Sequence, residues 1–221
     1  MNILLTAATP HEIQSTGEYL SEKTYYRKNC SVNVLITGVG MVNTAYALTK
    51  YIYQYRPQII IQAGIGGSLH PYYPPGTVVM IGEEIMADMG VQEEREFRDI
   101  FDLHLADENI FPFSKKMLVC PHHPIMEKIK LPVVRGITVN EITTGSDRMQ
   151  QLIEKYGAVI ESMEGAALHF VCLQESIPFV QLRAVSNFVG EREKTKWQIQ
   201  KAIAHLNREL IEVMHQLLSL E

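Results

Sequence analysis

The chain has 221 residues, of which 46% are hydrophobic and 20% are charged. This composition is typical of a single globular domain. The net charge of −5 and the lack of a basic stripe argue against a nucleic-acid partner. Three scattered cysteines, Cys30, Cys120 and Cys172, match no metal-binding spacing and suit a reducing compartment. With no apolar run of the ~18 residues that a membrane span needs and no signal peptide, we expect a cytoplasmic protein without membrane contacts.

Strand and helix patterns alternate along the whole chain. In order, the hydrophobic spacing predicts a strand over residues 2–8, a helix over 10–20, a strand over 32–37, a helix over 41–55, strands over 58–63, 77–85 and 133–138, a helix over 146–156, a strand over 158–160, a helix over 163–174, a strand over 179–185 and a helix over 199–218. Repeated β-α-β units predict one α/β domain spanning residues 1–221. Its expected architecture is a three-layer α/β/α sandwich around a mixed, mostly parallel sheet.

The least regular region covers residues 87–114. It contains a run of mixed charge at residues 93–96 and the sequence NIFPF at residues 109–113. A loop of this length inside a compact domain is typical of a lid or of an interface element.

Glycines and small polar residues follow several of the predicted strands. GVG occupies residues 38–40, GIGG residues 64–67, SME residues 162–164 and SN residues 186–187. In such sheets ligands bind beyond the carboxyl ends of the strands. The GVG turn is only a partial dinucleotide-binding motif, because Asn43 stands in place of its third glycine and no acid follows about 20 residues later. We expect neither a nucleotide cofactor nor a metal.

Taken in order, Glu12, the GVG turn, the GIGG segment, SMEG at residues 162–165 and RAVSN at residues 183–187 resemble the purine nucleoside phosphorylase and nucleosidase superfamily. The resemblance runs from residue 1 to about residue 215 and is closest to the nucleosidase branch. The segment NFVGEREKTKW at residues 187–197 is similar to that of the futalosine hydrolases. The resemblance implies a nucleoside phosphorylase-like fold, a purine nucleoside substrate and a homodimer or larger homo-oligomer.

The resemblance also implies roles for individual residues. Glu164 would bind the 2′- and 3′-hydroxyls of a ribose, and Met163 would pack beneath the sugar. Glu12 would activate a water as general base. Gly66 and Gly67 would line the sugar-and-water site through their backbone. From the residues themselves, Met163 also fits a core methionine and Glu164 a helix-starting acid at a helix N-terminus.

Two further alternatives come from the local sequence. Thr9, Pro10 and Glu12 fit a capping box with proline at the first helical position, so Glu12 also has a purely structural interpretation. Asn187 likewise fits a turn-forming asparagine after a strand.

Asn187 is the residue that discriminates most between substrates. The resemblance implies that adenine-cleaving nucleosidases carry an aspartic acid here, which protonates N7 of the leaving base. An asparagine supplies amide donors but no proton, and a 6-oxopurine presents acceptors at N7 and O6. Asn187 therefore favours hypoxanthine or guanine over adenine. Ser186 and Arg183 are expected to support the Asn187 loop, and Arg183 also fits an ordinary buried ion pair.

Together with these residues, the resemblance implies an N-ribosyl hydrolase that cleaves futalosine to hypoxanthine and dehypoxanthine futalosine in menaquinone biosynthesis. A phosphorylase is disfavoured, because Glu12 would repel phosphate and the loop at Gly38 has no Arg or Lys. A methylthioadenosine/adenosylhomocysteine nucleosidase and a non-catalytic nucleoside-binding protein stay open as alternatives.

The 5′ group of futalosine carries a carboxyphenyl ring. Aromatic cover for it could come from four phenylalanines of the irregular region, and its carboxylate could meet one of three arginines. The phenylalanines are Phe97, Phe101, Phe111 and Phe113, and the arginines are Arg95, Arg98 and Arg192. Alternatively, the same region packs against a second subunit.

Overall fold

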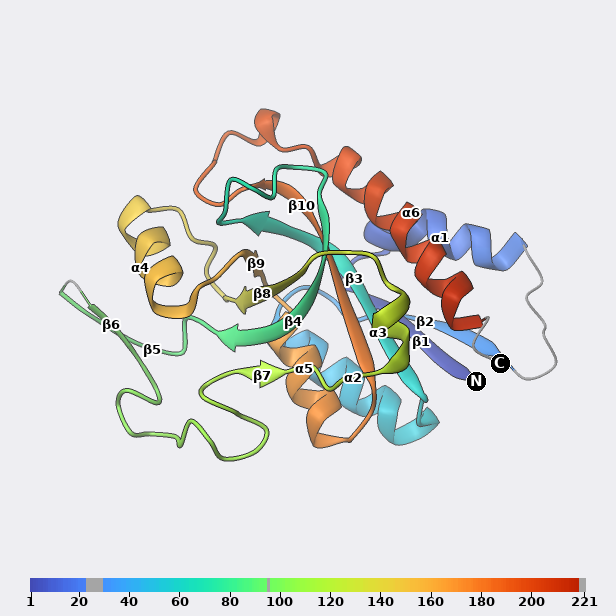
Figure 1. Ribbon diagram of the computed structural model, residues 1–221, viewed down its shortest axis with the longest axis horizontal. Helices are drawn as coiled ribbons and strands as arrows, with labels where there is room; N and C mark the ends of the chain where they lie inside the picture. The colour runs from blue at the N-terminus through green and yellow to red at the C-terminus, as the bar shows by residue number, and fades with distance from the viewer. Residues whose placement is uncertain (23–29, 95, 219–221) are drawn as a thin grey trace.

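The computed structural model describes residues 1–22, 30–94 and 96–218 (Figure 1). In chain order its elements are β1 (Asn2–Ala7), α1 (Pro10–Glu22), β2 (Ser31–Ile36), α2 (Met41–Tyr55), β3 (Ile59–Ser68), β4 (Val78–Met86), β5 (Gly90–Glu93), β6 (Glu96–Asp99), β7 (Leu118–Val119), α3 (Pro124–Lys128), β8 (Val133–Thr138), α4 (Ser146–Tyr156), β9 (Ile160–Ser162), α5 (Gly165–Gln174), β10 (Phe179–Phe188), the 3₁₀ turn η1 (Lys194–Lys196) and α6 (Ile199–Leu218).

One large mixed sheet organises the fold. Its strands follow the order β10, β4, β8, β9, β3, β1, β2, and β7 pairs with β4. Since β10 also pairs with β3, the first five strands of this order close into a ring. Among the described residues, five pairings of this sheet are parallel and three are antiparallel. The predicted mixed, mostly parallel sheet is therefore confirmed.

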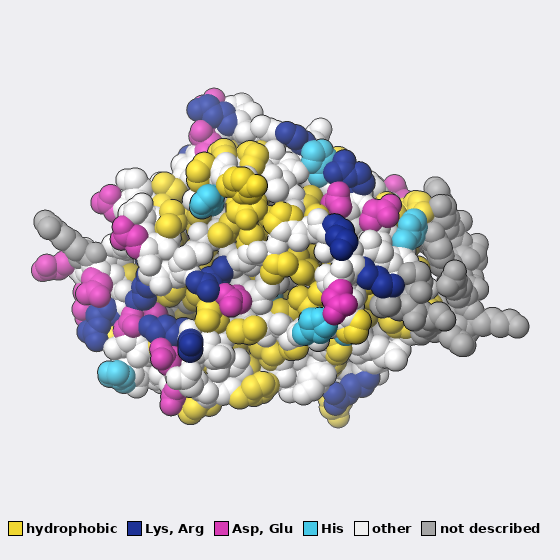
Figure 2. Space-filling model, viewed as in Figure 1, with side chains coloured by type: hydrophobic (Ala, Val, Ile, Leu, Met, Phe, Trp, Pro, Cys, Tyr) yellow, Lys and Arg dark blue, Asp and Glu magenta, His cyan; other side chains and the backbone are white. Residues whose placement is uncertain are grey.

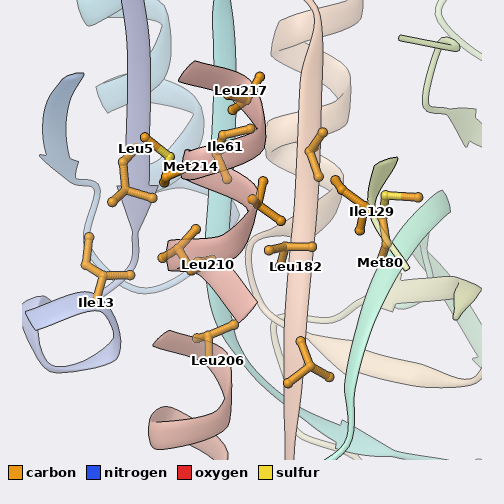
Figure 3. Packing of buried hydrophobic residues seen from close by; sticks show 14 of the residues in the cluster. Leu5, Ile13, Ile61, Met80, Ile129, Leu182, Leu206, Leu210, Met214 and Leu217 are labelled. Carbon is orange, nitrogen blue, oxygen red and sulfur yellow. The ribbon is translucent and has the colours of Figure 1, made fainter. Parts of the chain in front are cut away.

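Helices cover the sheet on two sides (Figure 1). Alternate residues of a strand point to opposite faces, so Leu5 and Ile61 belong to the hydrophobic cluster that includes α6 residues, whereas Leu4 and Ile60 belong to the cluster that includes residues of α2 and α5. Figure 3 shows the first cluster, in which Leu206, Leu210, Met214 and Leu217 of α6 face the strands. The three-layer α/β/α arrangement follows from burial on both faces of the central strands.

The structure differs from the predicted elements in several places. Residues 87–114 contain an antiparallel hairpin of β5 and β6, where an irregular loop was expected. The short elements β7 and α3 were not predicted. Strands β3 and β10 each extend to the cavity described below, through the GIGG segment and through Asn187. Helix α5 begins at Gly165 instead of residue 163, so Met163 and Glu164 precede it.

The surface carries charges of both signs. On the face drawn in Figure 2, Lys and Arg side chains are interspersed with Asp and Glu, and patches of hydrophobic side chains lie between them. Across the part of the chain that the structure describes, no helix combines the length and the apolar character needed to cross a membrane.

Candidate active site

A cavity of about 300 Å³ lies where strands β3 and β10 end. Strand β9, the segment that follows it and the loop after β1 form further parts of its walls. All seven site residues that the sequence predicts line this cavity: Glu12, Gly66, Gly67, Met163, Glu164, Ser186 and Asn187. They come from four separate parts of the sequence, and the sheet brings them together.

Glu12 is both a helix cap and a cavity residue. It is the third residue of α1, and its Oε2 accepts hydrogen bonds from the amide of Thr9 at 2.9 Å and from the Thr9 hydroxyl at 3.1 Å. Its Oε1 accepts from the amide of Ile65 at 3.0 Å. The reach back to Thr9 is the carboxylate half of a capping box. Because the side chain also lines the cavity, the two interpretations of Glu12 are compatible.

Glu164 is held at the N-cap position of α5, where its side chain makes no capping bond to its own helix. Its Oε1 accepts from the amide of Gly40 at 3.1 Å, and its Oε2 accepts from Arg183 Nη1 at 3.2 Å. Arg183 is 1% exposed and also donates to the carbonyl of Ile65 and to Gln62 Oε1. Arg183 thus holds Glu164 from behind and does not itself line the cavity.

The GVG turn presents its last amide to Glu164. Gly38 and Gly40 have φ angles of 84° and 93°, a left-handed backbone that glycine adopts without strain. This conformation allows the Gly40 amide to donate to Glu164 at the start of α2. The glycines of the GVG turn are therefore explained by the hydrogen bond to Glu164, without a dinucleotide.

Ser186 and Asn187 form a hydrogen-bonded pair at the end of β10. The Ser186 hydroxyl lies 2.7 Å from Asn187 Oδ1 and 3.2 Å from the carbonyl oxygen of Gly66. Asn187 Nδ2 donates to the carbonyl of Phe188 at 2.9 Å. A backbone carbonyl can only accept, so the Phe188 contact assigns the end of the amide beside it as the NH₂ group and the end beside Ser186 as the oxygen. The NH₂ group then has one further proton available, since an amide nitrogen carries two.

The two glycines of β3 pack where side chains have no room. A Cβ at Gly66 would lie 2.9 Å from the carbonyl oxygen of Glu161, and one at Gly67 would lie 2.8 Å from a methyl group of Val189. Their absent side chains let β9 and the residue that follows β10 pack closely against β3. Met163 is partly exposed and lines the cavity, so the core interpretation of this methionine is wrong.

Further lining residues were not predicted from the sequence. Glu161 and Thr143 add polar groups, and Trp197, Ile199 and Ile203 add an apolar wall next to Val189. Trp197 is fixed by a hydrogen bond from its indole nitrogen to the carbonyl of Glu191 at 2.8 Å. Of this wall, Val189 and Trp197 belong to the tail at residues 187–197 that resembles the futalosine hydrolases, whereas Glu161 stood beside the SMEG motif without any assigned role.

The predicted aromatic cover is wrong for this chain's own cavity. None of the four phenylalanines of residues 87–114 is among its lining residues. Phe97 instead lies under the Arg148 guanidinium at 4.1 Å, and Phe113 packs between Phe101 and Phe170. The hairpin segment is tied to α4 by Asp102, which binds both Lys116 and Lys155. The segment therefore packs on α4, away from the strand ends.

The three candidate arginines have different positions. Arg192 lines the cavity. Arg98 binds the carbonyl of Asp102 at 3.2 Å and lies 3.6 Å from a carboxylate oxygen of Glu93, so it is engaged within the hairpin segment. Arg95 lies outside the described residues.

Fold and cavity together define an α/β protein with a small-molecule cavity at its strand ends, lined by several carboxylates and an oriented amide. Residues 3–219 match the family model of the phosphorylase superfamily, and the chain belongs to this superfamily.

Two curated relatives and one solved structure show where within the superfamily the similarity lies. The chain is 30% identical to futalosine hydrolase of Thermus thermophilus over 178 residues, which cover 79% of this chain and 77% of the relative. It is 25% identical to the 5′-methylthioadenosine/S-adenosylhomocysteine nucleosidase of Bacillus cytotoxicus over 84% of this chain and 81% of that protein. The Helicobacter pylori enzyme with the latter name, solved with butyl-thio-DADMe-Immucillin-A, superimposes with a TM-score of 0.80 at 17% identity and 97% coverage of both chains. At that identity the superposition shows the shared fold.

Proposed function

We propose that this protein is an N-ribosyl hydrolase that cleaves futalosine to hypoxanthine and dehypoxanthine futalosine, a step of menaquinone biosynthesis, as a single nucleoside phosphorylase-like domain. The observation that carries the proposal is the oriented amide of Asn187, which shares one cavity with Glu12 and Glu164. The 30% identity to a futalosine hydrolase supports the choice of substrate.

The remaining hydrogen-bonding capacity of Glu164 fits a ribose. A carboxylate accepts about four hydrogen bonds, and the described structure fills two of these positions, from Gly40 and Arg183. Two positions remain for the vicinal 2′- and 3′-hydroxyls of the sugar. The negative charge of Glu164 also stabilises the oxocarbenium-like sugar that develops as the N-glycosidic bond breaks.

Glu12 has capacity left for one water. Thr9 and Ile65 supply three donors to its two oxygens, which leaves about one acceptor position on the carboxylate. A water held there lies in the same cavity as the sugar site and loses its proton to Glu12 as it attacks the anomeric carbon. Water is favoured over phosphate as the nucleophile, because Arg192 is the one Lys or Arg among the cavity-lining residues that the structure describes.

Asn187 binds the leaving base without protonating it. The second N–H of its NH₂ group, which has no partner in the described structure, donates to N7 or O6 of a 6-oxopurine. The anion of such a base is stabilised through O6 as it departs. An adenine leaves less readily and needs an acid at N7, which an amide does not supply. Arg192 is the candidate cation in the cavity for the carboxylate at the far end of the 5′ group.

We further propose that the protein is a cytoplasmic homodimer or larger homo-oligomer. Its three cysteines form no disulfide, which suits a reducing compartment. Leu105, Ile110 and Phe111 expose between 63% and 75% of their surface on the segment after β6. Exposed apolar side chains grouped on one segment are typical of an interface with another subunit.

The deciding experiment incubates the protein in parallel with futalosine, inosine and methylthioadenosine, with and without phosphate, and identifies the released base by chromatography. We expect fast release of hypoxanthine from futalosine without phosphate, slower release from inosine and little adenine from methylthioadenosine. Preference for methylthioadenosine would move the chain to the adenine-specific nucleosidases. A requirement for phosphate would make it a phosphorylase, and no release from any nucleoside would leave the non-catalytic alternative.

A further inference from the structure

Glu161 is a buried carboxylate of the cavity wall that the proposed mechanism does not use. It lies on β9, is 6% exposed and lines the cavity. Its Oε1 accepts a hydrogen bond from the amide of Thr143 at 3.1 Å. Its Oε2 is buried and has no hydrogen-bond partner within the described part of the chain. Buried polar atoms are almost always satisfied, so an unsatisfied carboxylate oxygen beside a ligand cavity indicates a donor on the ligand.

The sheet register places Glu161 and Asn187 on either side of Gly67. Gly67 pairs with Glu161 of β9 in an antiparallel register and, just past a register shift that follows Val185, with Asn187 of β10 in a parallel register. Directly opposed residues on neighbouring strands project from the same face of a sheet, with strands roughly 5 Å apart. A Cβ at Gly67 would lie 3.7 Å from Asn187 Nδ2, which shows that the amide is on this face. The two polar side chains therefore flank a residue that has no side chain of its own.

The two side chains offer opposite hydrogen-bonding groups. Asn187 has a free N–H donor, and Glu161 has a free carboxylate acceptor. The six-membered edge of a 6-oxopurine presents the matching pair, an O6 acceptor and an N1–H donor. Adenine presents the reverse pair, an amino donor at C6 and an unprotonated N1 acceptor. A carboxylate at N1 thus attracts the 6-oxopurine and repels adenine.

We propose that Glu161 is a specificity-determining residue that accepts the N1–H of a 6-oxopurine base, while Asn187 donates to the same base. This assignment rests on the proposed nucleosidase function and names the base class of that site. It also explains the Thr143 contact. Because Glu161 occupies the Thr143 amide, that N–H is not available to donate to N1 of an adenine.

The ionisation of Glu161 is consistent with this role. Burial raises the pKa of Glu161, and hydrogen bonds from Thr143 and the charge of Arg148 oppose the rise. Burial destabilises the ionised form of the carboxylate. A ligand N–H that donates to it stabilises that form.

The test compares wild type with Glu161→Gln on futalosine and on its 6-amino analogue, which differ only in the base. A glutamine keeps an oxygen for the Thr143 amide and adds an NH₂ group that an adenine N1 accepts. We expect kcat/KM for futalosine to fall about 10- to 100-fold, as for one hydrogen bond to a charged group, and the preference for the 6-oxo base to shrink at least tenfold. Glu141→Gln, an exposed glutamate of the neighbouring loop, is the matched control and should leave both values within about twofold.

A binding measurement separates failure of this assignment from failure of the proposed function. Trp197 is the single tryptophan of the chain and lines the cavity, so its fluorescence reports binding of free hypoxanthine and free adenine without any hydrolysis. Loss of base discrimination in Glu161→Gln, even in a protein that does not cleave futalosine, supports the assignment. Unchanged discrimination in a variant with the wild-type melting temperature overturns it, and Glu161 is then only an anchor for the Thr143 loop.

Discussion

Glutamates on the two sides of the α5 N-terminus lie in contrasting environments. On the cavity side, Glu164 faces an amide and the guanidinium of Arg183, and part of its acceptor capacity stays open. Beneath the helix, Glu84 of β4 is 1% exposed and meets only neutral donors, with Gln181 Nε2 at 2.9 Å and the Thr138 hydroxyl at 3.0 Å. Burial raises the pKa of Glu84 to about 7, against the weaker opposing effects of these hydrogen bonds and of Arg183.

The network of Glu84 supports the helix and does not reach the cavity. Thr138 donates to Glu84 and accepts from the amide of Ala166 at 2.8 Å, in the first turn of α5. A Cβ at Gly165 would overlap Glu84 Oε1, so the glycine of the SMEG motif is required for the helix to sit above this carboxyl. A buried glutamate is therefore available for chemistry where an open cavity meets it, as at Glu164. Where neutral groups enclose it, the same side chain fixes a helix.

Removing the carboxylate of Glu164 should have the largest effect on turnover. We expect Glu164→Ala to abolish measurable hydrolysis and to weaken nucleoside binding, because two ribose hydroxyls lose a charged acceptor worth roughly 1.5–3 kcal/mol per hydrogen bond. A 2′-deoxy nucleoside should be a poor substrate for wild type for the same reason. Steady-state kinetics on the ribo and 2′-deoxy forms check both points. Equal rates on the two sugars would show that Glu164 does not hold the ribose.

Substitution of Glu12 tests whether this carboxylate takes part in catalysis in addition to capping α1. We expect Glu12→Gln to bind nucleoside but to lose at least ~100-fold in turnover, the usual size of a general-base effect. The glutamine oxygen can still accept from Thr9 or from Ile65, so the melting temperature should fall only modestly. Single-turnover rates with a folded variant provide the measurement. Turnover within a few-fold of wild type would reduce Glu12 to a helix cap.

Asn187 tests the effect of adding a charge on the cavity side. We expect Asn187→Asp to lower futalosine cleavage about 10- to 100-fold, because a carboxylate repels O6 and lacks the amide donor. The same variant should raise the trace cleavage of methylthioadenosine, since an acid at N7 is what that reaction lacks here. Kinetics of both proteins on both substrates decide the point. A wild type that prefers methylthioadenosine contradicts the argument from Asn187.

Glu84 should show the smallest effect on turnover and a clear effect on stability. With its pKa near 7 in the native state and 4.5 as the ordinary value, the native protein holds more protons than the unfolded chain between these values. The free energy of unfolding therefore falls as pH rises from about 4.5 past 7, by about 3 kcal/mol. We expect Glu84→Gln to remove this slope and to keep kcat within about threefold of wild type.

Urea unfolding of wild type and Glu84→Gln at pH 5 and pH 8 measures this slope. The buried His169 acts in the opposite direction, because burial lowers its pKa to about 4 and stability then rises with pH up to its ordinary value. The difference between the two proteins isolates the contribution of Glu84. Identical pH dependence in both proteins would show that Glu84 ionises freely in the native state.

Several parts of the fold follow from local sequence. The bounds predicted for the helices over residues 41–55, 146–156 and 199–218 are those of α2, α4 and α6. In α4 the pattern ends at Gly157, which adopts a left-handed φ of 61° as the helix cap. Helical periodicity and caps depend on residues within one or two turns, so the local sequence is enough to predict where these helices begin and end. The seven predicted site residues could likewise be named, because the motifs and the resemblance supply them.

Only the tertiary structure decided what these residues contact. GIGG and Ser186–Asn187 have little intrinsic preference for strands, yet they extend β3 and β10 because the two strands pair with each other over long sequence separation. The hairpin of β5 and β6 packs on α4 through Asp99 and Lys155, which are more than 40 residues apart in sequence. This contact places Phe97 of the hairpin away from the cavity. The unsatisfied oxygen of Glu161 is visible only once β9 lies beside Gly67. Strand pairing and the burial of charge depend on neighbours distant in sequence, whereas helix ends depend on neighbours within one turn.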